Sequence, residues 1–299
     1  MKERMPAYGG QAVIEGVLMR GKSSVAMANR APNNEIVIHQ EKLTGVYTSK
    51  LIKVPFLRGL IGLWDALGLG MRYLTLSANV QTGEDEKIEG PMLYLTLAIS
   101  LMIGIGLFFL APALVSSLLA RVISMSAWVS NLLEGVFRLL LLIIYLWVIG
   151  KMPDIKRVFM YHGAEHKTIN AYEDGIELTV ENVASYSLQH PRCGTSFILT
   201  LVLLSILLFS LFGPLPLHWR LVSRLMMIPV LAGLAYEYIH FMSKHLDSPI
   251  VRFLIKPNLI LQNMTTREPS QDMLEVSIKA FNLMTSLENE SEPNRLIHP

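Results

Sequence analysis

Four long apolar segments interrupt the polar pattern of the chain after residue 90 and predict a membrane protein. Each comes close to the roughly 20 residues that a helix needs to cross the hydrocarbon core of a bilayer. The expected spans are residues 92–119, 132–149, 195–212 and 221–242. The sequence therefore predicts a mainly α membrane protein with about four transmembrane helices in residues 91–245, which include a central polar segment at 151–194.

Two of these spans carry ionisable residues, which are costly inside a membrane and usually face a partner or a site. The second span contains Glu134 and Arg138, which are spaced i, i+4 and are expected to pair with each other without a further function. The fourth span contains Glu237 and His240 near its end. These two are candidate site residues, and the alternative is an ordinary interfacial pair that reaches water.

The first 55 residues have a water-soluble pattern instead. Short apolar or alternating runs are separated by glycine, proline and asparagine, and they cover residues 11–19, 24–28 and 35–40. This spacing predicts a small N-terminal antiparallel β region with tight turns. It forms the first of the expected structural units, residues 1–55, on the cytoplasmic side.

Residues 55–79 are apolar but carry a charge every seven residues, at Arg58, Asp65 and Arg72. A helix that lies in the membrane interface suits this pattern better than one that spans the core, although a poorly hydrophobic span remains the alternative. An interfacial helix and a linker are therefore expected in residues 56–90.

The distribution of Lys and Arg predicts the orientation in the membrane. These residues are frequent before residue 90, in the central segment and after residue 245, and they are rare in the two other loops. Both termini and the central segment should therefore be cytoplasmic in a multi-pass protein. In the tail, residues 246–299, apolar periodicity predicts interfacial and cytoplasmic helices at 248–261 and 270–283.

Composition and charge exclude several classes of protein. The chain of 299 residues is 52% hydrophobic and 17% charged, against about 25% charged in typical soluble domains. A net charge of +2, without a basic patch that alternates with aromatics, argues against a nucleic-acid partner. The expected partner is the lipid bilayer, and a homo-oligomer is left open.

The central segment contains the most informative chemistry, the pattern His162-x-x-Glu165-His166. On a helix from about residue 154 to 172, His166 lies about 40° round from His162, Glu173 about 20° and Glu165 about 60° to the other side. Two histidines at i, i+4 can bind one metal ion. The order matches the inverted zinc-peptidase motif, in which His162 and His166 are ligands and Glu165 is the catalytic base. The alternative is a solvated helix face.

Further ligand types are expected at the same membrane depth. His190 and Cys193 stand just before the third span, where the alternative for Cys193 is a buried, small apolar side chain. The full set of candidate ligands is His162, His166, Glu173, His190, Cys193, Glu237 and His240. The expected cofactor is one divalent metal ion, most simply zinc, with iron or manganese as alternatives.

Four stretches of the chain resemble the bacterial YqhQ-like family, domain of unknown function 1385. They are residues 9–21, 161–173, 190–194 and 265–269. Members of that family are described as predicted metal-dependent enzymes of the membrane. The resemblance implies a bacterial cytoplasmic membrane protein, and it implies neither a substrate nor a catalytic residue.

Three functions remain open from the sequence. The first is a membrane-embedded, metal-dependent enzyme, a hydrolase, that acts on a membrane peptide, a lipid or another amphiphilic substrate. The second is an ion-handling transport or channel protein that uses the same cluster. The third is a membrane scaffold or assembly factor, in which the histidine cluster is structural.

Overall fold

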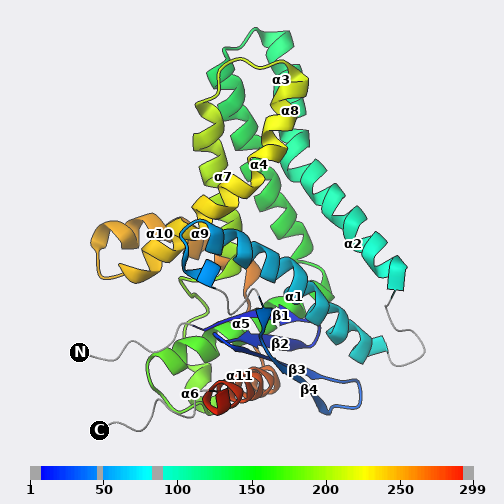
Figure 1. Cartoon of the computed structure of the whole chain (residues 1–299), viewed down its shortest axis with the longest axis vertical. Coiled ribbons are helices and arrows are strands. Elements are labelled where there is room, and N and C mark those ends of the chain that lie inside the picture. Colours follow the sequence, from blue (N-terminus) through cyan, green and yellow to red (C-terminus); the bar gives the residue numbers. More distant parts are fainter. Residues whose placement is uncertain (1–7, 46–49, 83–89, 292–299) are drawn as a thin grey trace.

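The computed structural model describes residues 8–45, 50–82 and 90–291 of the chain. Figure 1 shows a group of apolar helices above a small sheet that is covered by further helices. The strands are β1 (Gly9–Val13), β2 (Gly16–Arg20), β3 (Ser24–Arg30) and β4 (Ile36–Lys42). The expected fold class, mainly helical with membrane helices and an N-terminal antiparallel sheet, is confirmed.

Helices form most of the described chain. Those before the central segment are η2 (Lys50–Lys53), α1 (Leu57–Thr82), α2 (Gly90–Ile105), the π-helix η3 (Gly106–Leu110), α3 (Ala111–Ile123) and α4 (Ala127–Ile149). The others are α5 (Pro153–Glu173), α6 (Val180–Ala184), α7 (Gly194–Ser210), α8 (Leu217–Met226), α9 (Ile228–Lys244), α10 (Pro249–Thr265) and α11 (Gln271–Ser291).

The four strands form an antiparallel meander in the order β1-β2-β3-β4. The apolar run at residues 11–19 is two strands, because the chain turns at Ile14 and Glu15, where Glu15 has a φ of 51°. Non-glycine residues seldom adopt this left-handed conformation. The turn is the reason that a run which looks continuous in sequence divides into a hairpin.

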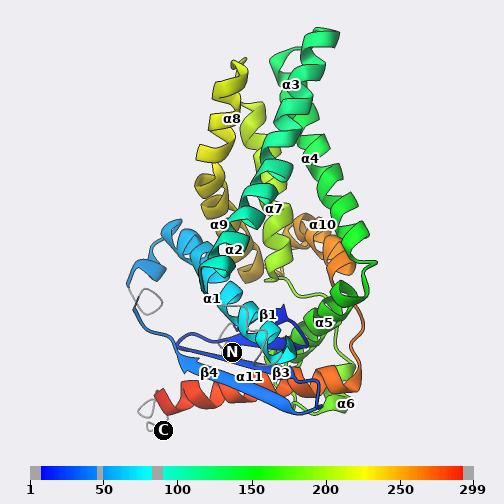
Figure 2. The ribbon, with the colours of Figure 1, turned by 90° about the vertical axis from the view of Figure 1, so that its right-hand side faces the viewer.

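Both faces of the sheet are apolar, so helices cover it on two sides. Val17 and Met19 of β2 pack with side chains of α5 and α11. Leu18 lies between them in sequence and points to the opposite face, where it packs with Leu69 and Tyr73 of α1. The result is three layers, with α1 on one side of the sheet and α5 and α11 on the other (Figure 2).

Helix α1 joins the sheet to the membrane helices through the charges that interrupt its apolar pattern. Asp65 pairs with Arg20 of β2, and Arg72 pairs with a glutamate of β4. At the start of the helix, Arg58 pairs with Glu237 of α9. Helix α1 is not among the candidate membrane spans within the described residues.

Two of the apolar helices are long enough to cross a membrane. They are the continuous α2–η3–α3 segment, Gly90–Ile123, and α4. Helices α8 and α9 qualify as a third span if they count together, although they are bent by 44° between Met226 and Ile228. Helix α7 is apolar but has 17 residues, or about 25 Å, which is less than the about 30 Å of the hydrocarbon core.

The last two helices return the chain to the sheet. Helix α10 packs against α7, and α11 lies across β2 and β3. The first and last described elements, β1 and α11, are therefore parts of one sheet-and-helix layer structure, together with α5 from the centre of the chain (Figure 1).

Candidate metal centre

Helix α5 is weakly apolar in sequence but deeply buried in the fold. It starts at Pro153, whose fixed φ suits the first helical position, and Asp154 in the first turn complements the positive end of the helix. Its buried side chains include Glu165, His166 and Lys167. Since charged and imidazole groups are seldom buried without partners, these residues mark the helix as the centre of a site.

The two histidines of the motif are held by backbone carbonyl groups. His162 Nδ1 lies 2.9 Å from the carbonyl oxygen of Thr265, and His166 Nδ1 lies 2.5 Å from that of Leu188. A carbonyl oxygen can only accept a hydrogen bond, so Nδ1 carries the proton in both rings. In the neutral tautomer that fits these contacts, the lone pair of each ring is on Nε2, as it is in many metal-binding histidines.

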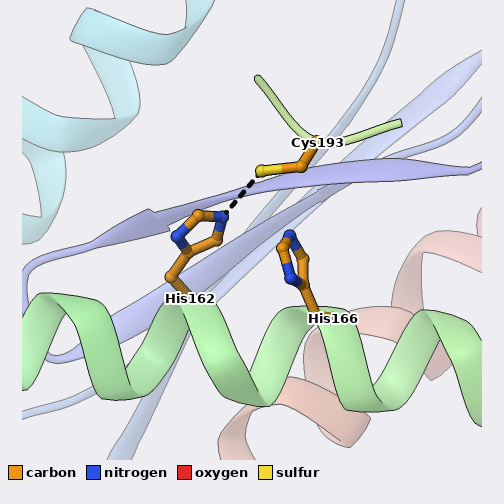
Figure 3. Close-up of side chains that lie close together, drawn as sticks. All are labelled: His162, His166 and Cys193. Carbon is orange, nitrogen blue, oxygen red and sulfur yellow. Dashed lines mark hydrogen bonds between the residues drawn. The ribbon is translucent and has the colours of Figure 1, made fainter. Parts of the chain in front are cut away.

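Cys193 completes a group of three potential ligands. It is the N-cap residue of α7, and its Sγ lies 3.1 Å from His162 Nε2. Figure 3 shows both rings projecting from α5 toward this sulfur. One ligand atom from each of His162, His166 and Cys193 lies within 4.8 Å of the other two.

The donor atoms of this group fit a divalent metal ion. His166 Nε2 is buried without a hydrogen-bond partner among the described residues. Two imidazole nitrogens and one thiolate sulfur form a ligand set that zinc accepts. The three side chains come from α5 and from the start of α7, so the fold assembles the group from two segments of the chain.

Gly163 allows another segment to lie directly against α5. A Cβ atom at this position would come within 2.2 Å of the carbonyl oxygen of Arg267. The amide of Arg267 also donates to the carbonyl of Phe159 at 2.9 Å. This close approach brings the neighbouring Thr265 carbonyl to the ring of His162.

Glu165 lies beside the group in a buried position. Its Oε2 is 4.0 Å from His162 Nε2, and its carboxylate is hydrogen-bonded by the backbone amide of Gly10. A Cβ atom on Gly10 would come within 2.8 Å of Glu165 Cγ, so the glycine leaves room for this side chain. Burial raises the pKa of Glu165, whereas the nearby imidazoles of His162 and His190 lower it to a smaller extent.

His190 and Glu173 adjoin the three-ligand group. The ring centroids of His190 and His166 are 5.7 Å apart, and His190 Nε2 is 3.7 Å from Glu173 Oε2. Glu173 also pairs with Arg192. Burial lowers the pKa of His190 to about 4, so its ring is neutral at neutral pH.

The two candidates from the last span face a different neighbour. Glu237 accepts hydrogen bonds from the backbone amide of Phe56 and from the guanidinium group of Arg58. His240 lies one turn further along α9, and its ring stacks on that of Tyr236. The structure thus brings Glu237 and His240 to α1, whereas the three-ligand group consists of His162, His166 and Cys193.

Sequence patterns do not reveal the carbonyl groups that orient the rings. Every residue has a carbonyl, so neither Thr265 nor Leu188 carries a local signal for this role. The buried Lys167 is also absent from the sequence-based site. Its Nζ donates to the carbonyl of Ala184 and pairs with Glu268, each at 2.6 Å.

The fold and the site define a class of protein: a chain with candidate membrane spans that carries a buried His-His-Cys group. The family described as "Protein of unknown function (DUF1385)" matches residues 54–287, and the chain belongs to this family. It is also 37% identical to the "Uncharacterized protein YqhQ" of Bacillus subtilis (strain 168) over 307 aligned residues, which cover 97% of this chain and 96% of that protein. No solved structure matches the chain.

Proposed function

We propose that this protein is a membrane-bound, metal-dependent hydrolase with its catalytic centre at the cytoplasmic face. One observation carries the proposal. The Nδ1 atoms of His162 and His166 are engaged by backbone carbonyls, so both Nε2 atoms face the sulfur of Cys193 and can turn their lone pairs to an ion beside it.

Three protein ligands distinguish a catalytic from a structural zinc site. Structural sites use four protein ligands, whereas catalytic sites use three and leave a position for water or substrate. A divalent ion held by His162, His166 and Cys193 would supply a Lewis acid that lowers the pKa of water at that position. Zinc suits this ligand set best, and iron and manganese are the alternatives.

Glu165 is the proposed general base. Its carboxylate lies 4.0 Å from His162 Nε2, next to the position of the ion. Burial raises its pKa, and a base works best when its pKa approaches the working pH. The amide of Gly10 holds the carboxylate in place, so the side chain can take a proton from water and return it to the leaving group.

The neighbourhood of the site supports an amphiphilic substrate. Cys193 begins the apolar helix α7, and α5 follows within four residues of the end of α4. A substrate with an apolar part, such as a lipid or a membrane peptide, could therefore remain in the bilayer while its ester or amide bond reaches the metal ion and the carboxylate of the site. The exposed edge of the site is His162, whose side chain is 12% exposed.

Metal analysis of the purified protein is the first test. We expect about one zinc ion per chain in the wild-type protein, none after His162→Ala/His166→Ala, and a strong reduction after Cys193→Ser. Glu165→Gln should keep the metal. His245→Ala is the matched control, because His245 is exposed and its Nδ1 contacts the carbonyl of Phe241.

Hydrolysis then separates a catalytic from a structural metal. Chromogenic fatty-acyl esters and fluorogenic membrane peptides should be hydrolysed by the wild-type protein and the His245→Ala control, but not by metal-loaded Glu165→Gln. Hydrolysis that survives Glu165→Gln would refute the role of this residue. Wild-type protein without metal, even after reconstitution with zinc at neutral pH, would refute the enzyme and favour a scaffold.

A further inference from the structure

A second cluster of charged side chains, here called the Glu134 cluster, lies among the apolar helices. It is separate from the group of His162, His166 and Cys193, here called the His162 site. Glu134 and Arg138 come from α4, and Arg220 and Arg224 come from α8. All four are buried, and Arg224 is 0% exposed. The sequence indicates the Glu134–Arg138 pair, but the two arginines of α8 join it only in the folded protein.

Within the part of the chain that the structure describes, Glu134 is the one carboxylate that bonds to these three arginines. Its Oε1 accepts from Arg138 Nη2 at 2.8 Å and from Arg224 Nε at 2.9 Å. Its Oε2 accepts from Arg220 Nη2 at 2.8 Å and from Arg224 Nη2 at 2.7 Å. Arginine does not lose its proton in proteins, so the cluster keeps an excess of two positive charges.

Neutral groups satisfy the remaining hydrogen bonds but not this charge. Arg138 donates to Ser205 Oγ at 2.7 Å, and Arg220 donates to the hydroxyl groups of Ser117 and Ser130 at 3.0 and 2.9 Å. Hydroxyl groups cannot neutralise a guanidinium group. A buried excess of positive charge is unfavourable at membrane depth, and an anion would remove that cost.

A cavity of about 280 Å³ adjoins the cluster. Arg220 and Arg224 line it together with the exposed Arg121, and its polar lining includes Ser117 and Asn131. It lies between the α3–α4 turn and the connection from α7 to α8. Figures 1 and 2 show that this end of the helices is the one furthest from the sheet.

Exposed tryptophans indicate the depth of the cavity in a bilayer. Trp128 of α4 and Trp219 of α8 are 57% and 58% exposed at this end. At the other end of α4, Trp147 is 58% exposed and lies beneath the ammonium group of Lys151. Tryptophan gathers at both membrane interfaces, and 19 residues of helix measure about 28 Å. The cavity is therefore at the level of lipid head groups.

We propose that this cavity binds a phosphate-bearing anion. The guanidinium fork of the exposed Arg121 matches the geometry of phosphate oxygens better than that of chloride. Arg220 and Arg224, which donate to Glu134, add positive charge at the wall of the cavity. The phosphate group can come from a phospholipid of the nearer leaflet or from inorganic phosphate in solution. The site is independent of the proposed hydrolase and of its metal.

Binding measurements on the detergent-purified full chain test this proposal. One arm uses equilibrium dialysis with radiolabelled inorganic phosphate. The other uses native mass spectrometry with phosphatidylglycerol, and diacylglycerol serves as the phosphate-free control. The test variant is Arg121→Gln, since an exposed side chain can change without loss of the fold. Arg252→Gln on α10 is the matched control, because Arg252 is also exposed and does not line the cavity.

We expect binding to weaken about tenfold in Arg121→Gln and to stay unchanged in Arg252→Gln. The conservative variant Arg220→Lys keeps the charge but loses the fork that Arg220 places on Glu134 at the cavity wall, and it should weaken binding as well. Binding in the dialysis arm identifies inorganic phosphate, and binding of phosphatidylglycerol without diacylglycerol identifies a lipid head group. Absence of binding in both arms, or binding that Arg121→Gln and Arg220→Lys leave unchanged, would overturn the proposal and leave a purely structural cluster.

Discussion

The His162 site and the Glu134 cluster both bury polar side chains, but they differ in what their hydrogen bonds leave uncompensated. The His162 site has lone pairs available for a ligand, whereas the Glu134 cluster has an excess of positive charge. In the His162 site, Nδ1 is bonded in both rings of the motif, and lone pairs on nitrogen and sulfur converge. In the Glu134 cluster, the guanidinium groups share one carboxylate. Lone pairs suit a cation and excess positive charge suits an anion. The kind of ligand that a buried polar cluster accepts thus follows from the lone pairs or the net charge that its own hydrogen bonds do not compensate.

The two glutamates make the difference concrete. Glu134 is 1% exposed and Glu165 is 5% exposed, so burial does not distinguish them. Three arginines bond to Glu134, and its negative charge is essential to them. Glu165 instead has the amide of Gly10 and two nearby imidazoles, and burial raises its pKa. One carboxylate is a fixed counter-ion, whereas the other can exchange a proton.

The same substitution at both glutamates should therefore have unequal effects on stability. Glu134→Gln removes the counter-ion of three buried arginines, and loss of one partner from such a group costs about 3–5 kcal/mol. Glu165→Gln replaces a carboxyl whose charged form burial disfavours, and its amide oxygen can still accept from Gly10. We expect a cost below about 1 kcal/mol. Thermal unfolding in detergent measures both, and equal losses would contradict the comparison.

The helices and the ligand types were accessible from sequence because their signals are local. The apolar spans follow from hydropathy, and α5 was expected at about 154–172 and is found at Pro153–Glu173. Within that helix, i, i+4 spacing alone brings His162 and His166 onto one face. The sequence also indicates Cys193 as a candidate ligand, since His190 and Cys193 directly precede an apolar helix.

The long-range partners could not be predicted because they depend on packing between distant segments. The sequence indicates Glu237 and His240 as further ligands because of their residue types and their position near the end of an apolar segment. In the structure α9 packs against α1, and Arg58 donates a hydrogen bond to Glu237. Likewise, the i, i+4 spacing predicts the Glu134–Arg138 pair, which is present at 2.8 Å. It gives no sign of Arg220, which lies on α8, 86 residues after Glu134 in the chain.

Acidification should affect the two clusters differently, because histidine titrates in this range and arginine does not. The pKa of His190 falls from its ordinary 6.5 to about 4 through burial. Between these values the unfolded chain binds a proton that the folded protein does not. Stability is therefore complete above about pH 6.5 and declines as the pH falls toward 4, by about 3 kcal/mol.

Thermal unfolding of chelator-treated protein across this pH range tests the contribution of His190. His190→Gln should flatten the decline, and the difference between the two curves reports the contribution of His190 together with its coupling to Glu165. His245→Gln is a control, because His245 is an exposed histidine. If the curves of His190→Gln and the wild type stay parallel from pH 6.5 to 4, His190 is not buried in its neutral form.

The smallest expected effect comes from adding one methyl group beside each cluster. In Gly163→Ala the new Cβ would meet the carbonyl oxygen of Arg267 at 2.2 Å, whereas in Gly135→Ala it would meet Cγ1 of Ile206 at 2.5 Å. A side chain can turn away more easily than a backbone segment. We expect Gly163→Ala to cost about 1–3 kcal/mol and Gly135→Ala to cost less.

Zinc affinity distinguishes the two glycine variants, because only Gly163 lies beside the proposed metal ligands. Displacement of the Arg267 segment would withdraw the Thr265 carbonyl from His162 Nδ1, and loss of such an orienting contact typically weakens metal binding about 10–100-fold. Gly135→Ala adjoins Glu134 and should leave zinc affinity unchanged, as measured by competition with a chromophoric chelator. Equal zinc affinity in Gly163→Ala and the wild type would mean that the ring of His162 keeps its orientation without the Thr265 carbonyl. The two clusters would then differ only in what they offer a ligand, which is lone pairs in the His162 site and positive charge in the Glu134 cluster.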